Sequence, residues 1–209
     1  MKNRLRDKKA GIVILISLIL ISLADIIFRA FAISGQTLIN TANLGEQVAV
    51  IALAVAILIL TATGKDRASY LLYGAWIFYF VIDQIFELPG MITSWVAELY
   101  IGVMTPLVLA GYMMTILSAV TIIALGALLI EYMNDGSIYN RAFNVLCVLT
   151  VVLTVGSICI DLFDVINNGS LVYMLAAFNK MYRVAMVFLF AFFAYDSAKL
   201  QLKKSNLSE

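Results

Sequence analysis

The sequence predicts an all-α integral membrane protein with six transmembrane helices, arranged as three successive helical hairpins that form one bundle. Of the 209 residues, 63% are hydrophobic and 13% are charged, whereas soluble domains contain roughly 45–50% apolar residues. The long Leu, Ile, Val, Ala and Phe runs lack the apolar–polar alternation of a transmembrane β-strand. Inside lipid, helices satisfy their own backbone hydrogen bonds, so these runs are expected to be helical.

The predicted helix boundaries follow from apolar runs and turn residues. A basic cytoplasmic N-terminus occupies residues 1–9, and a cytoplasmic tail occupies residues 199–209. The expected transmembrane helices cover residues 10–34, 44–63, 69–88, 103–133, 141–166 and 175–198. The third helix is expected to end at Pro89-Gly90, because proline disfavours helical geometry in the residue before it.

Two segments allow a second interpretation. Met91–Met133 carries charges only at Glu98 and Glu131, and we expect a short interfacial helix followed by one span. Two closely spaced spans are the alternative, because the stretch is about twice as long as the roughly 20 residues that cross a bilayer. The basic start and Ala30-Phe31-Ala32 also fit a cleaved secretory signal peptide, although the repeat described below favours retention of the first helix.

The distribution of Lys and Arg predicts the orientation in the membrane. Five of these residues precede the first helix, two lie in the turn after the second, one lies between the fourth and fifth, and three lie in the tail. By the positive-inside rule both termini are cytoplasmic and the protein belongs to the cell membrane. The lipid bilayer is therefore an expected partner, and a membrane partner subunit or a second copy of this chain is a further candidate partner.

The composition argues against several classes of function. The formal net charge is +1, so no bulk attraction to nucleic acid is expected. The chain contains no histidine, the commonest metal ligand and general base. It also lacks a Gly-rich phosphate loop, an HExxH motif and a Cys-x-x-Cys pair. We therefore expect neither an enzyme nor a cofactor or metal site.

Three similar passages suggest a threefold hairpin repeat. Each places an aspartate late in an odd-numbered helix, at Asp25, Asp83 and Asp161. A second ionisable residue follows each aspartate by one helical turn, on the same face. These second residues are Arg29, Glu87 and Asp164.

The repeat places a candidate binding site within the membrane. A charge there costs at least about 2.5 kcal/mol, so such residues usually face a bundle interior and find partners. The candidate ligand-binding residues are Asp25, Asp83, Glu87, Asp161 and Asp164, with Arg29, Lys180 and Arg183 as ion-pair partners. The acidic excess favours a small cationic or amine-bearing solute in an outward-facing cavity. A carrier, channel or substrate-binding subunit would have such a site.

A structural or accessory role is the competing interpretation. Here Asp25 pairs with Arg29, and the two bases of the last helix neutralise Asp161 or Asp164, so the charges fix helix pairing.

In the sequence, Asp83 and Glu87 have no basic neighbour. These two acids are therefore the expected ligand contacts.

Overall fold

The computed structural model describes the backbone of residues 2–32, 37–102, 105–135, 141–168 and 171–205. Side chains are described for residues 9–30, 44–102, 105–131, 141–167 and 174–195. The predicted end of the first helix at 33–34, the turns at 136–140 and 169–170, residues 103–104 and the last four residues lie outside this part.

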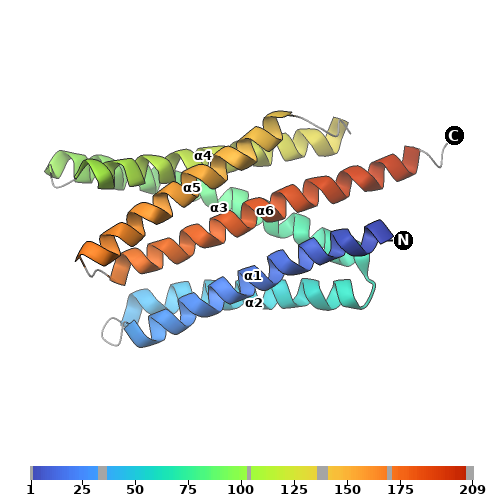
Figure 1. Ribbon diagram of the computed structural model, residues 1–209, viewed down its shortest axis with the longest axis horizontal. Coiled ribbons are helices and arrows are strands. Elements are labelled where there is room, and N and C mark those ends of the chain that lie inside the picture. The colour runs from blue at the N-terminus through green and yellow to red at the C-terminus, as the bar shows by residue number, and fades with distance from the viewer. Residues whose placement is uncertain (1, 33–36, 103–104, 136–140, 169–170, 206–209) are drawn as a thin grey trace.

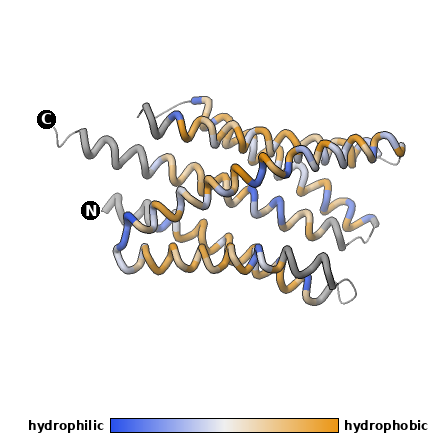
Figure 2. Tube along the Cα trace, turned by 180° about the vertical axis from the view of Figure 1, so that it is seen from behind, coloured by the Kyte–Doolittle hydropathy of each residue, from blue (hydrophilic) through white to orange (hydrophobic). Residues whose placement is uncertain are grey.

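Within the described residues the chain forms six helices. They are α1 (Lys2–Ala32), α2 (Thr37–Ala62), α3 (Asp66–Ile101), α4 (Pro106–Asp135), α5 (Arg141–Asn168) and α6 (Leu171–Ser205). Each contains a segment long and apolar enough to cross a membrane. In Figure 2 most of every helix has apolar colours, interrupted by polar stretches at helix ends and in the half of the bundle away from the labelled termini. The prediction of a six-helix membrane protein is confirmed.

Consecutive helices pack as adjacent pairs, α1 with α2, α3 with α4, and α5 with α6. Further contacts join α4 to α5 and α1 to α6, and α6 also contacts α3 and α4, so the three hairpins close into one bundle. Figure 1 shows the marked N and C ends at the same end of the bundle. The sequence repeat itself stays a prediction.

The apolar core lies where α1, α2, α3, α4 and α6 meet. Its fully buried side chains include Leu18 of α1, Ile57 of α2, Ile77 of α3, Leu125 of α4 and Phe190 of α6. These residues recur at helical spacing on the inward faces of their helices, as burial of an apolar stripe requires. The core therefore holds together the ends of the helices on which the candidate site is built.

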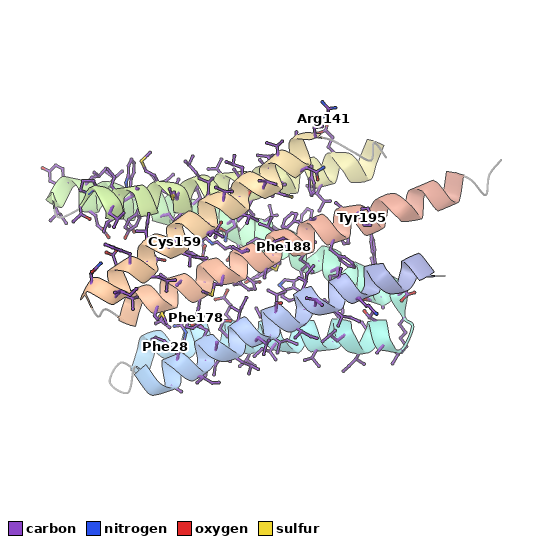
Figure 3. The ribbon with its side chains drawn as sticks, viewed as in Figure 1. Phe28, Arg141, Cys159, Phe178, Phe188 and Tyr195 are labelled. Carbon is purple, nitrogen blue, oxygen red and sulfur yellow. The ribbon has the colours of Figure 1, made fainter. Side chains whose placement is uncertain are left out.

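The outer surface of the bundle is also largely apolar. Phe188 and Cys159, labelled in Figure 3, are exposed on α6 and α5, and many Leu, Ile, Val and Phe side chains share this exposure. A soluble protein rarely leaves such large apolar patches uncovered. Lipid is the environment that this surface fits.

The expected end of the third helix at residue 88 is wrong, because α3 continues through Pro89 to Ile101. An internal proline removes one backbone hydrogen bond, here the one to the carbonyl of Ile85, and membrane helices tolerate such a loss. Thr93 donates from its hydroxyl to the carbonyl oxygens of Pro89 and Gly90. The helix ends instead at Gly102, whose φ of 70° is left-handed and whose N–H bonds to the Leu99 carbonyl.

The expectation of one separate span within residues 91–133 agrees with the structure, whereas the short interfacial helix and the alternative of two spans are corrected. Residues 91–101 are the last turns of α3 and form neither a separate interfacial helix nor a span of their own. The one span in this stretch is Pro106–Glu131. With 36 residues, α3 is about 54 Å long, and it therefore extends beyond a hydrocarbon core of about 30 Å.

Candidate functional site

The three aspartates of the predicted repeat lie at similar depths in the bundle. Asp25, Asp83 and Asp161 are 16 to 20 residues into their apolar spans, which is about 24–30 Å along a helix. The antiparallel pairing of the helices thus puts their charged turns at the same level. Asp25 and Asp161 lie 7 residues before the ends of α1 and α5, whereas α3 continues for 18 residues beyond Asp83.

The first ion pair lies entirely on α1. Arg29 Nε donates to Asp25 Oδ2 over 2.8 Å, and the two side chains are only 5% and 1% exposed. Their spacing of four residues places both groups on one helix face. Asp25 Oδ1 and the hydroxyl of Ser22, one turn earlier, have no hydrogen-bond partner within the described part of the chain.

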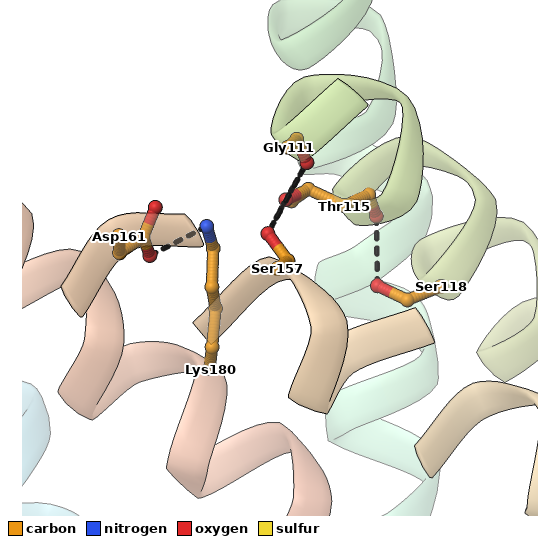
Figure 4. A network of polar contacts seen from close by, with 6 residues as sticks. All are labelled: Gly111, Thr115, Ser118, Ser157, Asp161 and Lys180. Carbon is orange, nitrogen blue, oxygen red and sulfur yellow. Dashed lines mark hydrogen bonds and ion pairs between the residues drawn. The ribbon is translucent and has the colours of Figure 1, made fainter. Parts of the chain in front are cut away.

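The second ion pair joins α5 to α6. Lys180 Nζ lies 2.6 Å from Asp161 Oδ2, and Figure 4 shows the lysine reaching across from the neighbouring helix. Asp164, one turn after Asp161, is buried. It forms no ion pair with any side chain that the structure describes.

The third ion pair joins α3 to α6 and corrects a prediction. Glu87 Oε2 accepts from Arg183 Nη2 over 3.0 Å and from Gln84 Nε2 over 3.2 Å. Arg183 was expected to neutralise Asp161 or Asp164, and this is wrong, because helix packing places it against Glu87, which is 96 positions away in the sequence. We call this meeting of Glu87, Gln84 and Arg183 the Glu87 junction.

Gln84 is a site residue that the sequence interpretation missed. It is 1% exposed, and its Nε2 also lies 3.4 Å from Asp83 Oδ2. Gln84 follows Phe80 by four residues and Trp76 by eight, on the face of α3 that is buried. Gln84 could have been predicted from the sequence, because an amide side chain stands there on an otherwise apolar helix face.

Glu46 of α2 connects the charged groups of α1 and α3. Its carboxylate interacts electrostatically with Asp25 and Arg29 on one side and with Asp83 and Glu87 on the other. Arg183 similarly interacts with Asp83 and Glu87. A single group of charges therefore extends over α1, α2, α3, α5 and α6.

We call this group the ionisable cluster and define it by nine described side chains. Its acids are Asp25, Glu46, Asp83, Glu87, Asp161 and Asp164, and its bases are Arg29, Lys180 and Arg183. If all are ionised, acids exceed bases by three. Within the described residues no three Asp, Glu or Cys side chains are grouped so that they could hold a metal ion.

Aromatic side chains adjoin the cluster on the side of the apolar core. Trp76 Nε1 donates to Tyr182 Oη over 3.1 Å, and the rings of Phe80 and Tyr182 meet edge to face with centroids 5.7 Å apart. Tyr182 interacts electrostatically with Glu46 and Asp83. Trp76 and Phe80 are buried in the apolar core, so the cluster borders directly on packed aromatic rings.

A row of hydroxyls leads along α5 to the cluster and was also missed. Thr150, Thr154 and Ser157 are buried on the face that carries Asp161 and Asp164. The Thr150 hydroxyl bonds to that of Thr121 on α4, and the Ser157 hydroxyl to that of Thr115, each over 2.8 Å. Figure 4 shows the second contact beside Asp161. The row could have been predicted from the sequence, because its hydroxyl residues alternate at spacings of four and three, which places them on one helix face.

Aromatic packing also fixes the helices on which the cluster is carried. Phe28 of α1 and Phe178 of α6, both labelled in Figure 3, lie with ring centroids 5.8 Å apart. Phe28 precedes Arg29, and Phe178 precedes Lys180 by two residues. This contact holds the charged turns of α1 and α6 at the same level.

Comparison with known proteins adds no relative. No protein-family model, no curated protein and no solved structure matches the chain. What the sequence and structure together establish is a six-helix membrane protein that carries an ionisable cluster between its helices.

Proposed function

We propose that this membrane protein binds a small cationic or amine-bearing solute at the ionisable cluster, as a carrier, a channel or a substrate-binding subunit. The observation that carries the proposal is the excess of carboxylates. Each of the three bases is engaged by one acid. Glu46, Asp83 and Asp164 have no ion pair among the described side chains.

An excess of negative charge within a membrane requires compensation. Carboxylates there are costly unless they are paired, protonated or in contact with water. The ammonium group of a bound solute would supply one positive charge beside the three remaining acids and would gain from the negative potential of the cluster. Tyr182, which is only partly buried, supports an organic cation in particular, because it offers ring surface and a hydroxyl beside the cluster.

We further propose that the site opens to the outside of the cell. The support is the positive-inside rule, since eleven of the fourteen Lys and Arg residues lie at the end of the bundle that carries the termini. Reporter fusions after Asp66 should be cytoplasmic, and fusions after Gly102 should be external. The reverse pattern would refute the outward orientation without touching the binding proposal.

Ligand-dependent thermal unfolding of the purified protein in detergent tests the binding proposal. A panel of inorganic cations and small amines is added, and a ligand at 100 times its Kd should stabilise the protein by about 2.7 kcal/mol. In Asp83→Asn this stabilisation should be lost while the unliganded protein remains folded. Glu98→Gln is the matched control, because Glu98 lies further along α3 and accepts instead from Tyr112 Oη. A panel without any effect on wild type would refute the proposal.

A non-catalytic structural or accessory role is the second candidate, and one observation favours it. Two of the three ion pairs join different helices, Lys180–Asp161 between α6 and α5, and Arg183–Glu87 between α6 and α3. Such pairs specify which helices meet, within one chain or at a partner subunit or second copy. If this candidate is right, a single substitution of Lys180 or Asp161 should lower stability, and the double variant that exchanges the two residues should restore it. No cation should then shift the melting temperature.

A further inference from the structure

We infer that the solute is a zwitterion, with an ammonium group and an anionic oxygen group on one small molecule. This inference rests on the function proposed above and specifies the ligand of that same site. It comes from the Glu87 junction, where one hydrogen-bond donor and one acceptor are buried and have no partner among the residues that the structure describes. The donor is Arg183 Nη1 and the acceptor is Gln84 Oε1.

Arg183 supplies the contact for the anionic end. Its Nη2 is engaged by Glu87, whereas its Nη1 has no partner among the described residues and the side chain is buried. A guanidinium is a planar fork of donors that matches a carboxylate or phosphate. One arm of this fork is used and the other is available.

Gln84 supplies the contact for the cationic end. Its Nε2 donates toward Glu87 and Asp83, which are both acceptors, so its Oε1 is necessarily the free atom of the amide. An ammonium carries three N–H donors and needs three acceptors. Gln84 Oε1 provides one, and the nearby Asp83 carboxylate, without an ion pair in the described residues, provides charge as well.

The two unpaired atoms belong to side chains that meet at the same carboxylate oxygen, Glu87 Oε2. An inorganic cation would satisfy Gln84 but would be repelled by Arg183. A simple anion would satisfy Arg183 but would enter a cluster in which acids exceed bases by three. A zwitterion satisfies both atoms, and buried polar groups are seldom left unpaired in native structures.

Access to these atoms lies on the side of Glu87. Glu87 is 48% exposed, whereas Gln84 and Arg183 are buried behind it. An incoming anionic group competes with the Glu87 carboxylate for the guanidinium, and the departing carboxylate can turn outward. The ligand therefore reaches the junction without unfolding the apolar core.

The test is isothermal titration of the purified protein with matched compounds. Ethylammonium carries only the cationic end, propionate only the anionic end, and glycine, β-alanine and 4-aminobutanoate carry both at increasing separation. Glycerophosphoethanolamine separates a lipid-headgroup source from a free amino acid. We expect at least one zwitterion to bind about tenfold or more tightly than ethylammonium, since a hydrogen bond to a charged group is worth that factor or more.

Arg183→Lys assigns this preference to the guanidinium. The variant keeps a positive charge for Glu87 but removes Nη1, so zwitterion affinity should fall about tenfold to a hundredfold while ethylammonium affinity is retained. Arg141→Lys, at the exposed start of α5, is the matched control and should bind as wild type does. Gln84→Met, which keeps the side-chain length but removes Oε1, tests the cationic contact should Arg183→Lys fail to fold.

The outcomes separate this inference from the proposed function. If ethylammonium binds wild type as tightly as every zwitterion, the zwitterion inference is wrong and cation binding stands. If Arg183→Lys keeps the full preference for zwitterions, the assigned contact is wrong. If no amine or zwitterion binds, the inference is wrong, and the proposed function fails with it when the inorganic cations of the unfolding panel also have no effect.

Discussion

The ion pair within α1 and the ion pair between α3 and α6 use the same chemistry but differ in how they are closed. Asp25 and Arg29 are four residues apart on one helix, and both are almost fully buried. Glu87 and Arg183 come from helices that are distant in the sequence, and Glu87 is half exposed. The first pair needs no other helix for its contact, whereas the second exists only after the bundle has formed.

This difference separates stability from binding. Loss of one partner from a buried pair leaves a charge without compensation, whereas water or headgroups can reach an exposed partner. The α1 pair should therefore matter most for stability. The Glu87 junction, with its unpaired donor and acceptor, should matter most for ligand binding.

The largest expected effect is that of Asp25→Asn. Removing the carboxylate leaves the Arg29 guanidinium buried without its counter-charge, which should cost about 3–5 kcal/mol of unfolding free energy. Denaturant titration of the protein in detergent micelles measures this loss. The double variant Asp25→Asn/Arg29→Gln should recover most of the loss, because no charge is then orphaned. A double variant no more stable than the single one would show that the pair is not the cause.

An intermediate effect is expected for Asp161→Asn. Lys180 then loses its partner, but the lysine is less buried than Arg29, and its long stem can move the ammonium toward a wetter environment. The cost should be about 2 kcal/mol, between the values for buried and exposed pairs. Asp164→Asn is the control and should cost less, since no base pairs with that carboxylate in the described residues. Equal losses would argue against the Lys180 contact.

A smaller effect is expected where the contact is neutral. Thr150→Val removes the buried hydroxyl that bonds to Thr121 across α4 and α5, which should cost about 1 kcal/mol. Thr63→Val is the matched control, because Thr63 is exposed and its hydroxyl bonds only within its own helix end. In thermal unfolding, Thr150→Val should have a lower melting temperature than wild type, and Thr63→Val should have the same melting temperature as wild type. If Thr63→Val had the lower melting temperature and Thr150→Val melted like wild type, the hydroxyl row would not be a stabilising contact.

The smallest effect should come from Glu87→Gln. The introduced amide oxygen can still accept from Arg183, and Asp83 remains within electrostatic range of the guanidinium. Arg183 is buried, but it keeps the amide oxygen and the nearby Asp83, and Glu87 is half exposed. The loss should therefore be close to the value of about 0.2–1 kcal/mol for exposed pairs, and the melting temperature should hardly change without ligand. A loss as large as that of Asp25→Asn would mean that both pairs are equally important for folding and would end the distinction between them.

Local features of the structure could be predicted from the sequence because they depend on spacing along one helix. Six apolar segments set the number of spans, short turns set the hairpins, and the four-residue step from Asp25 to Arg29 set that ion pair. The end of α3 was mispredicted for a related reason. A rule for proline derived from the local backbone ignores that a helix in a membrane bundle can lose the one hydrogen bond that Pro89 removes and still continue to Ile101.

Composition and spacing along the chain were enough to predict the class of protein, its six helices and the level at which charges occur along each of them. Which charges meet depends on how the helices pack. Arg183 could have faced any of several acids, and the packing of α6 against α3 selected Glu87 and enclosed Gln84 beside it. Contacts between residues 96 positions apart depend on which helices become neighbours and how they rotate, and no spacing rule within a single helix contains that information.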